Sequence, residues 1–440
     1  MSERDQHVAV IGLGYVGLPL AIGLADAGRT VVGLDIDTRK VERLNRGESH
    51  IPDVSSEAVD RLVRSGRFIA TTDPDALRQP DAIFICVPTP LDAMRAPDLS
   101  FIRSAAESVQ PRLRRGHLIV LESTTYPGTT EEVLQPVLES TGLRAGIDFD
   151  LAFVPERTDP GQVESKGWTI LNTPKVVGGL TPGSAERAGT LLAALGAPVH
   201  IVSSPRAAEM AKLLENTFRS VNIALVNELA LLCERMNIDV WEVIGAAATK
   251  PFGFMPFRPG AGAGGHCIPV DPLYLSWKAR EFDFHTNFID LAAQVNQDMP
   301  YHVVDLIVRG LSKQGRALDG AHILVLGVAF KRDIDDARNS PAERVIELLI
   351  ERGATVAYHD PHVPRFRAGG NVFHRQRETL ESVPLMDAAL AAADCVVIVT
   401  GHTSIDYRRV AAQARLVVDT GNTIPRDARA SVIRLGAPPR

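Results

Sequence analysis

The chain has 440 residues, of which 45% are hydrophobic and 23% charged, and its formal net charge is -6. This length suggests two or three domains, and the charge balance, without a long basic run, argues against nucleic acid or membrane partners. The N-terminal segment MSERDQH is polar and unlike a signal peptide, so we expect a cytoplasmic protein.

The first predicted elements form a βαβ unit. An apolar run over residues 8–11 indicates a strand, a glycine turn and a helical pattern follow, and a second strand is expected over 30–34. The turn reads GLGYVG, a GxGxxG pattern that lets a backbone and a helix N-terminus approach a pyrophosphate. Asp35 ends the second strand, where a carboxylate accepts hydrogen bonds from ribose hydroxyls and repels a 2′-phosphate.

This unit predicts NAD as the cofactor, in preference to NADP. Arg39 weakens the preference, because a basic residue there can stack on adenine or reach a phosphate. The expected cofactor contacts in this unit are Gly12, Gly14, Tyr15, Val16, Gly17, Asp35 and Arg39.

Further strand-like runs alternate with helical patterns as far as residue 153. The runs FIATTD, DAIFICVPTP, HLIVLESTT and FDLAFVPE are mostly continuous in apolar residues, which is typical of a parallel sheet covered on both faces. Thr89 and Thr124 follow two of these strands, at the edge where ligands bind in such sheets. Each is either a cofactor contact or a helix cap.

Residues 205–238 predict one long helix without internal proline or glycine. Helices of this length often join two domains and pack against their copy in a dimer, and a homodimer is our hypothesis. Glu209, Lys212 and Asn216 share one helix face. They form either a solvated face or a reactive set in which Lys212 acts on protons and Asn216 donates a hydrogen bond to a reacting oxygen.

The segment GAGAGGHCIPVDP, residues 260–272, is the strongest candidate for chemistry. Cys267 follows a flexible glycine loop, whereas the other three cysteines lie in apolar or helical patterns typical of burial. A thiol beside NAD can attack an aldehyde to form a thiohemiacetal, whose oxidation gives a thioester that water hydrolyses. The cysteine spacing shows no zinc pattern, so we expect no metal.

A polar linker at 310–320 precedes a second α/β pattern that weakly repeats the first. It contains Gly327 but no GxGxxG, so we expect no second dinucleotide there. Lys331 and Arg338 follow its first strand and are either ligands of an anion such as a diphosphate or solvated charges. The fold class expected is α/β, with two Rossmann-like, doubly wound parallel sheets and domains at 1–200, 201–312 (a central helical dimerisation region) and 313–440.

The motifs together resemble the UDP-glucose/GDP-mannose dehydrogenase family of nucleotide-sugar 6-dehydrogenases. The resemblance covers nearly the whole chain and is carried, in order, by GLGYVGLPLA, VPTP, ESTTYPGTT, VPER, the E-x-x-K-x-x-x-N helix, GGHCIPVDP and GVAFKRDIDDARNSP. It implies an NAD domain, a central dimerising region and a C-terminal domain that binds the nucleotide sugar. It also implies oxidation of a sugar C6 alcohol to a carboxylate in two NAD-dependent steps.

The resemblance assigns roles to individual residues. Cys267 is expected to be the nucleophile, with Lys212 and Asn216 stabilising oxyanions and Asp271 acting with Lys212 on protons through water. Glu156 is linked to thioester hydrolysis and Thr124 to its water site, whereas Arg338 reaches cofactor or substrate phosphates. The expected substrate contacts are Glu156, Arg157, Lys212, Asn216, Arg258, Gly264 and Lys331, and the expected cofactor contacts include Thr89, Thr124 and Arg338.

Two departures from the family pattern affect positioning and not the reacting groups. Ala261 replaces a proline of the glycine loop, and Val154 replaces a serine before the Pro-Glu pair. The stretch VPERTDPG most resembles the branch acting on UDP-N-acetylglucosamine, which makes a uronic acid for surface polysaccharide. UDP-N-acetylmannosamine and UDP-glucose stay open, and the alternatives of another kind are a one-step hydroxy-acid dehydrogenase and a non-catalytic nucleotide sensor.

Overall fold

The computed structural model describes residues 6–92, 94–158, 167–371, 374, 376–428 and 431–438. The chain divides into two compact units, Met1–Glu215 with Leu273–Phe284 and Asn216–Pro272 with His285–Arg440. Two helices pass from one unit into the other along the chain, α8 (Pro205–Met236) and α10 (Asp271–Ala279). Both carry residues singled out above, so each unit is described with its own part of these helices.

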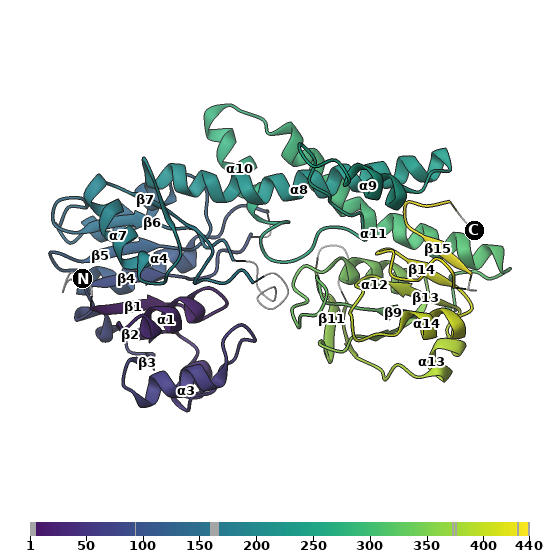
Figure 1. The fold of residues 1–440 in the computed structure, drawn as a ribbon, viewed down its shortest axis with the longest axis horizontal. Helices are drawn as coiled ribbons and strands as arrows, with labels where there is room; N and C mark the ends of the chain where they lie inside the picture. The colour runs from purple at the N-terminus through teal and green to yellow at the C-terminus, as the bar shows by residue number, and fades with distance from the viewer. Residues whose placement is uncertain are drawn as a thin grey trace. The chain divides into compact units, whose positions relative to one another are not determined.

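The first unit is built on one sheet with strand order β3-β2-β1-β4-β5-β6-β7-β8 (Figure 1). The order reverses at β1, whose neighbours are β2 on one side and β4 on the other, and this places the glycine turn after β1 at a topological switch point. The strands are β1 (His7–Ile11), β2 (Thr30–Leu34), β3 (Phe68–Thr71), β4 (Ala82–Ile85), β5 (Leu118–Leu121), β6 (Asp150–Phe153), β7 (Lys175–Gly179) and β8 (Val199–Val202).

Both faces of this sheet are buried, which explains the continuous apolar runs. Val8 and Val10 of β1 belong to one hydrophobic cluster, and Ala9 and Ile11 belong to another, because successive strand residues point to opposite faces. The helical segments of the unit are α1 (Gly17–Asp26), α2 (Thr38–Asn45), α3 (Ser56–Arg64), η1 (Pro74–Arg78), α4 (Ser100–Val109), η2 (Gln110–Arg112), η3 (Thr130–Leu134), α5 (Gln135–Glu139) and α7 (Pro182–Ala193).

One strand pair departs from the parallel pattern, because β7 runs antiparallel to β6. Parallel neighbours need a crossover connection, usually a helix, whereas antiparallel neighbours do not. The described residues between these strands, 154–158 and 167–174, form no helix. The pair β7 and β8 is itself parallel and has α7 as its crossover.

The second unit contains a parallel sheet of order β10-β9-β13-β14-β15 and a two-stranded antiparallel ribbon, β11-β12 (Figure 1). Ile323 and Val325 of β9 face one hydrophobic cluster, and Leu324 and Leu326 face the other. The expected α/β class with two Rossmann-like sheets is confirmed. The remaining elements are α9 (Val240–Ala247), η4 (Arg280–Phe282, in the first unit), α11 (Asn287–Lys313), β9 (His322–Leu326), α12 (Pro341–Glu351), β10 (Thr355–His359), β11 (Arg365–Gly369), β12 (Arg377–Glu381), α13 (Asp387–Ala392), β13 (Cys395–Ile398), α14 (Tyr407–Gln413), β14 (Val417–Asp419) and β15 (Val432–Arg434).

Helix α8 forms where one long helix was predicted and ends through a left-handed residue. Asn237 has a φ of 59°, and the N–H of Ile238 donates to the Cys233 carbonyl at 2.9 Å, which closes the last turn. Among the described residues, no helix combines the length and the apolar composition needed to cross a bilayer.

Candidate active site

The glycine turn after β1 has the shape of a phosphate-binding turn. Gly12 has a φ of 90°, and a Cβ there would lie 2.5 Å from the Cys86 carbonyl oxygen; a Cβ at Gly17 would lie 1.9 Å from the Gly12 carbonyl oxygen. A Cβ at Gly14 would meet no atom within 4 Å, so this position faces open space. No side chain caps the first turn of α1. The turn therefore offers backbone N–H groups and room for an anion, as a dinucleotide pyrophosphate requires.

Asp35 is held rigidly beside this turn. Its carboxylate accepts hydrogen bonds from the Leu13 and Asp37 N–H groups, both at 2.9 Å, and lies 3.4 Å from the Lys40 ammonium. The Arg39 side chain is instead 89% exposed and forks onto Asp37. Lys40, which the sequence pattern does not single out, is thus the basic residue that pairs with the Asp35 carboxylate.

Two further strand ends carry the predicted threonines. Thr89 follows β4 and is buried, whereas Thr124 follows β5 and is half-buried. The Ser123 hydroxyl donates to the Val87 carbonyl at 2.7 Å and ties these two loops together. Both threonines therefore lie at the same edge of the sheet as the glycine turn.

Glu156, after β6, belongs to a buried ionic cluster. Its carboxylate accepts hydrogen bonds from the fully buried Lys175 ammonium at 2.9 Å and from the Thr158 hydroxyl. Burial raises the pKa of Glu156, but Lys175 and Thr158 lower it more, and the resulting pKa is about 2. The Lys212 ammonium, from α8, donates to the Glu156 backbone carbonyl at 2.6 Å. The predicted residues Glu156 and Lys212 therefore come together in the first unit.

The same cluster contains a second carboxyl group that the sequence analysis missed. Glu122, after β5, accepts a hydrogen bond from the Cys86 thiol at 3.3 Å. Burial raises the pKa of Glu122 to about 7, and the Lys175 ammonium opposes this rise in part. A carboxyl group followed by serine and threonine at a strand end is the sequence signal that could have found it.

Arg157 has its guanidinium engaged within the first unit. It donates to the Glu215 carboxylate at 2.9 and 2.6 Å and to the Pro174 carbonyl at 2.8 Å. A substrate contact by Arg157 would therefore have to share or replace these bonds.

In the second unit, the glycine loop that precedes Cys267 packs on the segment after β9. A Cβ at Gly265 would lie 2.8 Å from the Phe330 ring, and the Gly265 N–H donates to the Arg338 carbonyl at 3.1 Å. A Cβ at Gly264 would lie 2.8 Å from the Pro341 side chain. These contacts place the Cys267 loop beside the segment that carries the predicted Lys331 and Arg338.

Cys267 differs from the other three cysteines, which are buried, because its side chain is only half-buried. The Cys267 carbonyl accepts the N–H of Asp271 at 2.8 Å, and the Asp271 carboxylate accepts the Asn216 amide at 2.6 Å. Three predicted residues thus gather around one turn.

The other predicted basic residues of this unit differ in exposure. Lys331 is half-buried and Arg258 is exposed, and the Arg338 guanidinium donates two hydrogen bonds to the Asp336 carboxylate.

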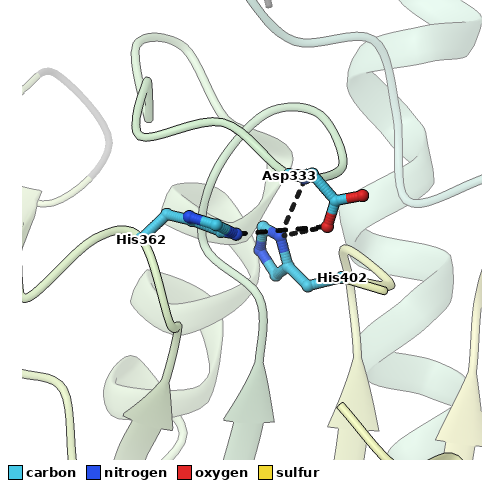
Figure 2. Close-up of side chains that lie close together, drawn as sticks. All are labelled: Asp333, His362 and His402. Carbon is cyan, nitrogen blue, oxygen red and sulfur yellow. Dashed lines mark hydrogen bonds and ion pairs between the residues drawn. The ribbon is translucent and has the colours of Figure 1, made fainter. Parts of the chain in front are cut away.

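A cluster of Asp333, His362 and His402 lies at the carboxyl ends of the second sheet (Figure 2). Its ligand atoms are close enough to suggest a metal site. However, the His402 Nδ1 accepts the Asp333 N–H at 3.0 Å, and its Nε2 lies 3.0 Å from the Asp360 carboxylate. Both nitrogens of His402 are therefore engaged, and a metal would have to break one of these bonds.

Asp360 occupies in the second sheet the place that Asp35 occupies in the first. Gly327 repeats the role of Gly12, since a Cβ there would lie 2.1 Å from the Thr400 carbonyl oxygen. The Asp360 side chain is fully buried and accepts N–H groups of four residues besides the His402 contact. Both carboxylate oxygens of Asp360 already accept hydrogen bonds within the protein, so this aspartate does not offer a ribose contact.

Three family models match the chain in order. They describe the UDP-glucose/GDP-mannose dehydrogenase family: the NAD binding domain at residues 6–195, the central domain at 206–298 and the UDP binding domain at 324–426. UDP-N-acetyl-D-glucosamine 6-dehydrogenase of Pseudomonas aeruginosa is 40% identical over 362 residues, which cover 82% of this chain and 84% of that protein. UDP-N-acetyl-D-mannosamine dehydrogenase of Pyrococcus horikoshii is 35% identical over 95% of this chain and 96% of that protein.

Solved structures agree with these matches. The structure of UDP-D-ManNAc dehydrogenase from Pyrococcus horikoshii has a TM-score of 0.88 to this chain at 32% identity, and the match covers 98% of this chain and 99% of that chain.

Proposed function

Because the chain belongs to the UDP-glucose/GDP-mannose dehydrogenase family and is an NAD-dependent nucleotide-sugar dehydrogenase, we propose that it oxidises the C6 alcohol of UDP-N-acetylglucosamine to a carboxylate. The product is the corresponding uronate. The observation that carries the full oxidation is the half-buried Cys267 in a glycine loop, beside the Asn216–Asp271 hydrogen bond. Oxidation to an aldehyde alone needs no thiol.

The first unit holds the cofactor in this proposal. The turn from Gly12 to Gly17 faces the pyrophosphate, and the Asp35 carboxylate accepts hydrogen bonds from the ribose hydroxyls. NAD, when bound, supplies a hydride acceptor for each of the two oxidation stages. Thr89 and Thr124 mark the sheet edge at which the reacting end of the cofactor is expected.

Cys267 forms the covalent intermediates. Its sulfur adds to the carbonyl carbon of the C6 aldehyde and gives a thiohemiacetal, which loses a hydride to become a thioester. Water then cleaves the thioester, releasing the carboxylate and the thiol. Lys212 and Asn216 donate hydrogen bonds to the oxyanion at each stage, and Asp271 accepts a proton through water.

Glu156 supports the hydrolysis by holding water, and not by taking its proton. A carboxylate with a pKa of about 2 is almost always ionised near neutral pH and is a weak base there. It is, however, a strong hydrogen-bond acceptor. We therefore assign it the orientation of the attacking water, with Thr124 as a second contact to that water.

The choice of sugar rests on similarity. One relative named for UDP-N-acetyl-D-glucosamine is 40% identical, relatives named for UDP-N-acetyl-D-mannosamine are 35% and 36% identical, and the VPERTDPG stretch resembles the former branch. The four cysteines are free, which supports a reducing compartment such as the cytoplasm.

NADH formation from a panel of nucleotide sugars tests the reaction and the sugar together. With UDP-N-acetylglucosamine, UDP-N-acetylmannosamine, UDP-glucose and GDP-mannose assayed side by side, we expect two molecules of NADH per UDP-N-acetylglucosamine and the mass of the uronate. The same stoichiometry with another sugar discards the substrate assignment. A single NADH per substrate contradicts the thioester route and favours a one-step dehydrogenase.

A homodimer through α8 is part of the proposal, because this helix exposes large apolar side chains. Leu225, Leu229, Leu232 and Met236 are 39–58% exposed and recur at helical spacing. We expect the protein to sediment as a dimer at micromolar concentration and Leu225→Glu to shift it toward monomer. Ile147→Glu, at a 75% exposed position away from α8, is the control and should stay dimeric. If the wild-type protein sediments as a monomer in analytical ultracentrifugation, the dimer hypothesis is wrong.

A further inference from the structure

The turn after β9 that carries Lys331 is held from both neighbouring strands of the second sheet. Strand β9 lies between β10 and β13, to which it is hydrogen-bonded. Asp360 comes directly after β10, and its Oδ2 accepts the N–H groups of Val328 and Ala329 at 2.7 and 3.0 Å. These two hydrogen bonds anchor the turn on the N-terminal side of Lys331.

His402, in the loop after β13, anchors the turn on the other side of Lys331. Its Nδ1 accepts the Asp333 N–H at 3.0 Å (Figure 2), and its Nε2 lies 3.0 Å from Oδ2 of Asp360. Because Nδ1 accepts a hydrogen bond, the proton of the neutral imidazole is on Nε2, which donates it to the carboxylate. Both anchors of the turn therefore end on the same oxygen atom, that of Asp360.

The second anchor is buried and supports an uncommon backbone conformation. The His402 and Asp360 side chains are both 0% exposed. Asp333 has a φ of 60°, which lies in the left-handed region that few residues other than glycine adopt. Its carboxylate also accepts the N–H and the hydroxyl of Thr403 at 2.8 and 2.9 Å. Two consecutive residues of the loop after β13 thus hold Asp333 in this conformation.

We propose that His402 is a positioning residue for binding of the nucleotide sugar, because it holds the turn that carries Lys331. The proposal rests on the proposed function for the role of Lys331 toward the substrate. A lysine ammonium stands on a long flexible stem, so its backbone has to be fixed if it is to meet an anionic group such as a diphosphate. Without the anchor at Asp333, the turn must be ordered at each binding event, and this ordering weakens binding.

Two amide variants separate the two hydrogen bonds of His402. His402→Asn places an amide oxygen where Nδ1 lies and keeps the acceptor for the Asp333 N–H. His402→Gln places an amide nitrogen where Nε2 lies and keeps only the bond to Asp360. We expect His402→Gln to weaken binding of UDP to the whole protein about tenfold, and His402→Asn less than about threefold, as measured by calorimetry.

The order of these two effects distinguishes positioning from stability. The bond to the charged Asp360 is the stronger of the two, so a role in stability alone predicts that His402→Asn is at least as harmful as His402→Gln. Thermal unfolding measures the stability of each variant and verifies that it is folded.

A double-mutant cycle shows whether His402 acts through Lys331. Lys331→Ala alone should weaken UDP binding about tenfold or more. Adding His402→Gln to Lys331→Ala should then weaken binding less than about twofold further, because the turn no longer carries an ammonium to place. A further loss of about tenfold would show that His402 acts independently of Lys331 and would overturn the proposal.

His117→Gln is the matched control. His117 is also 0% exposed, and its Nδ1 also accepts a backbone N–H, that of Arg114 at 3.2 Å, but it lies in the first unit. The variant should lose stability and keep the UDP affinity of the wild-type protein.

Four other results overturn the proposal: no UDP binding by the wild-type protein, wild-type affinity in His402→Gln, equal losses in the two His402 variants, or an equal loss in His117→Gln. If His402→Gln does not fold, Thr403→Val takes its place, because it removes the hydroxyl donor to the Asp333 carboxylate. It should weaken UDP binding about threefold, and an unchanged affinity overturns the proposal. UDP binding needs no turnover, so failure of the proposed function shows separately, as absence of NADH formation from every nucleotide sugar.

Discussion

Cys267→Ser is expected to lower complete oxidation of the nucleotide sugar by on the order of 10³-fold or more, with NAD binding nearly unchanged. The exchange replaces one atom in a half-buried side chain, so the glycine loop and the Asn216–Asp271 bond should persist. A serine hydroxyl is a much weaker nucleophile than a thiolate, and no thioester can form. NADH absorbance, product mass and calorimetric NAD binding provide the measurement.

The first oxidation does not need the thiol, so the serine variant can still release up to one NADH per sugar, with the aldehyde as product. Cys395→Ala serves as the control, because this thiol is fully buried in β13 and has no proposed chemical role. It should keep two NADH per sugar even if it is less stable. Wild-type turnover by Cys267→Ser would contradict the nucleophile assignment.

The fold and the family of this chain were predictable wherever local pattern decides the outcome. The GxGxxG turn followed by Asp35, the long helix and the glycine loop before Cys267 each combine residue types that serve few other purposes. The structure shows the physical reason at Gly12 and Gly17, where a Cβ would strike backbone. The weak sequence repeat was also informative, because Gly327 makes the same close approach in the second sheet.

The contacts of individual side chains were not predictable in this way. The sequence predicts Arg39 as a contact to adenine or to a phosphate, and this stays a prediction. What the sequence does not show is that the exposed Arg39 side chain pairs with Asp37 and that the Lys40 ammonium lies 3.4 Å from the Asp35 carboxylate. Spacing along the chain gives no direction for a long flexible side chain. The partner of the buried Tyr274 hydroxyl, the Thr89 carbonyl, could not be predicted either, because the two residues lie far apart in the sequence.

Buried charge is the other feature that sequence alone does not reveal. Lys175 opens β7 and, from the sequence, resembles a solvated strand end, yet its side chain is fully buried and forms an ion pair with Glu156. Only the pairing of β6 with β7 brings it to Glu156. The largest effect on stability that we expect from a single substitution follows from this pair.

Lys175→Met is expected to destabilise the first unit by about 3–5 kcal/mol, because it leaves the buried Glu156 carboxylate without its cation. In a unit of this size that corresponds to a fall of about 10 °C in the midpoint of its calorimetric transition. The equivalent change in an exposed pair, Arg365→Met opposite Glu381, should cost less than about 1 kcal/mol.

The loss of stability in Lys175→Met should depend on pH, because it comes from the charges of Glu156 and Lys175. In the wild-type protein, the pKa of Glu156 is lowered to about 2 and the pKa of Lys175 is raised. The ion pair therefore stabilises the fold fully between about pH 4.5 and pH 10.5, the ordinary pKa values of glutamate and lysine. This stabilisation is lost as Glu156 becomes protonated below the window and as Lys175 loses its proton above it. In the methionine variant, burial raises the pKa of Glu156, and protonation relieves the uncompensated charge. The stability deficit should therefore be smaller at pH 5 than at pH 8. The double variant Glu156→Gln/Lys175→Met should recover much of the lost stability at pH 8. If the loss of stability in Lys175→Met does not depend on pH and the double variant does not relieve it, Lys175 stabilises the unit through packing and not through its charge.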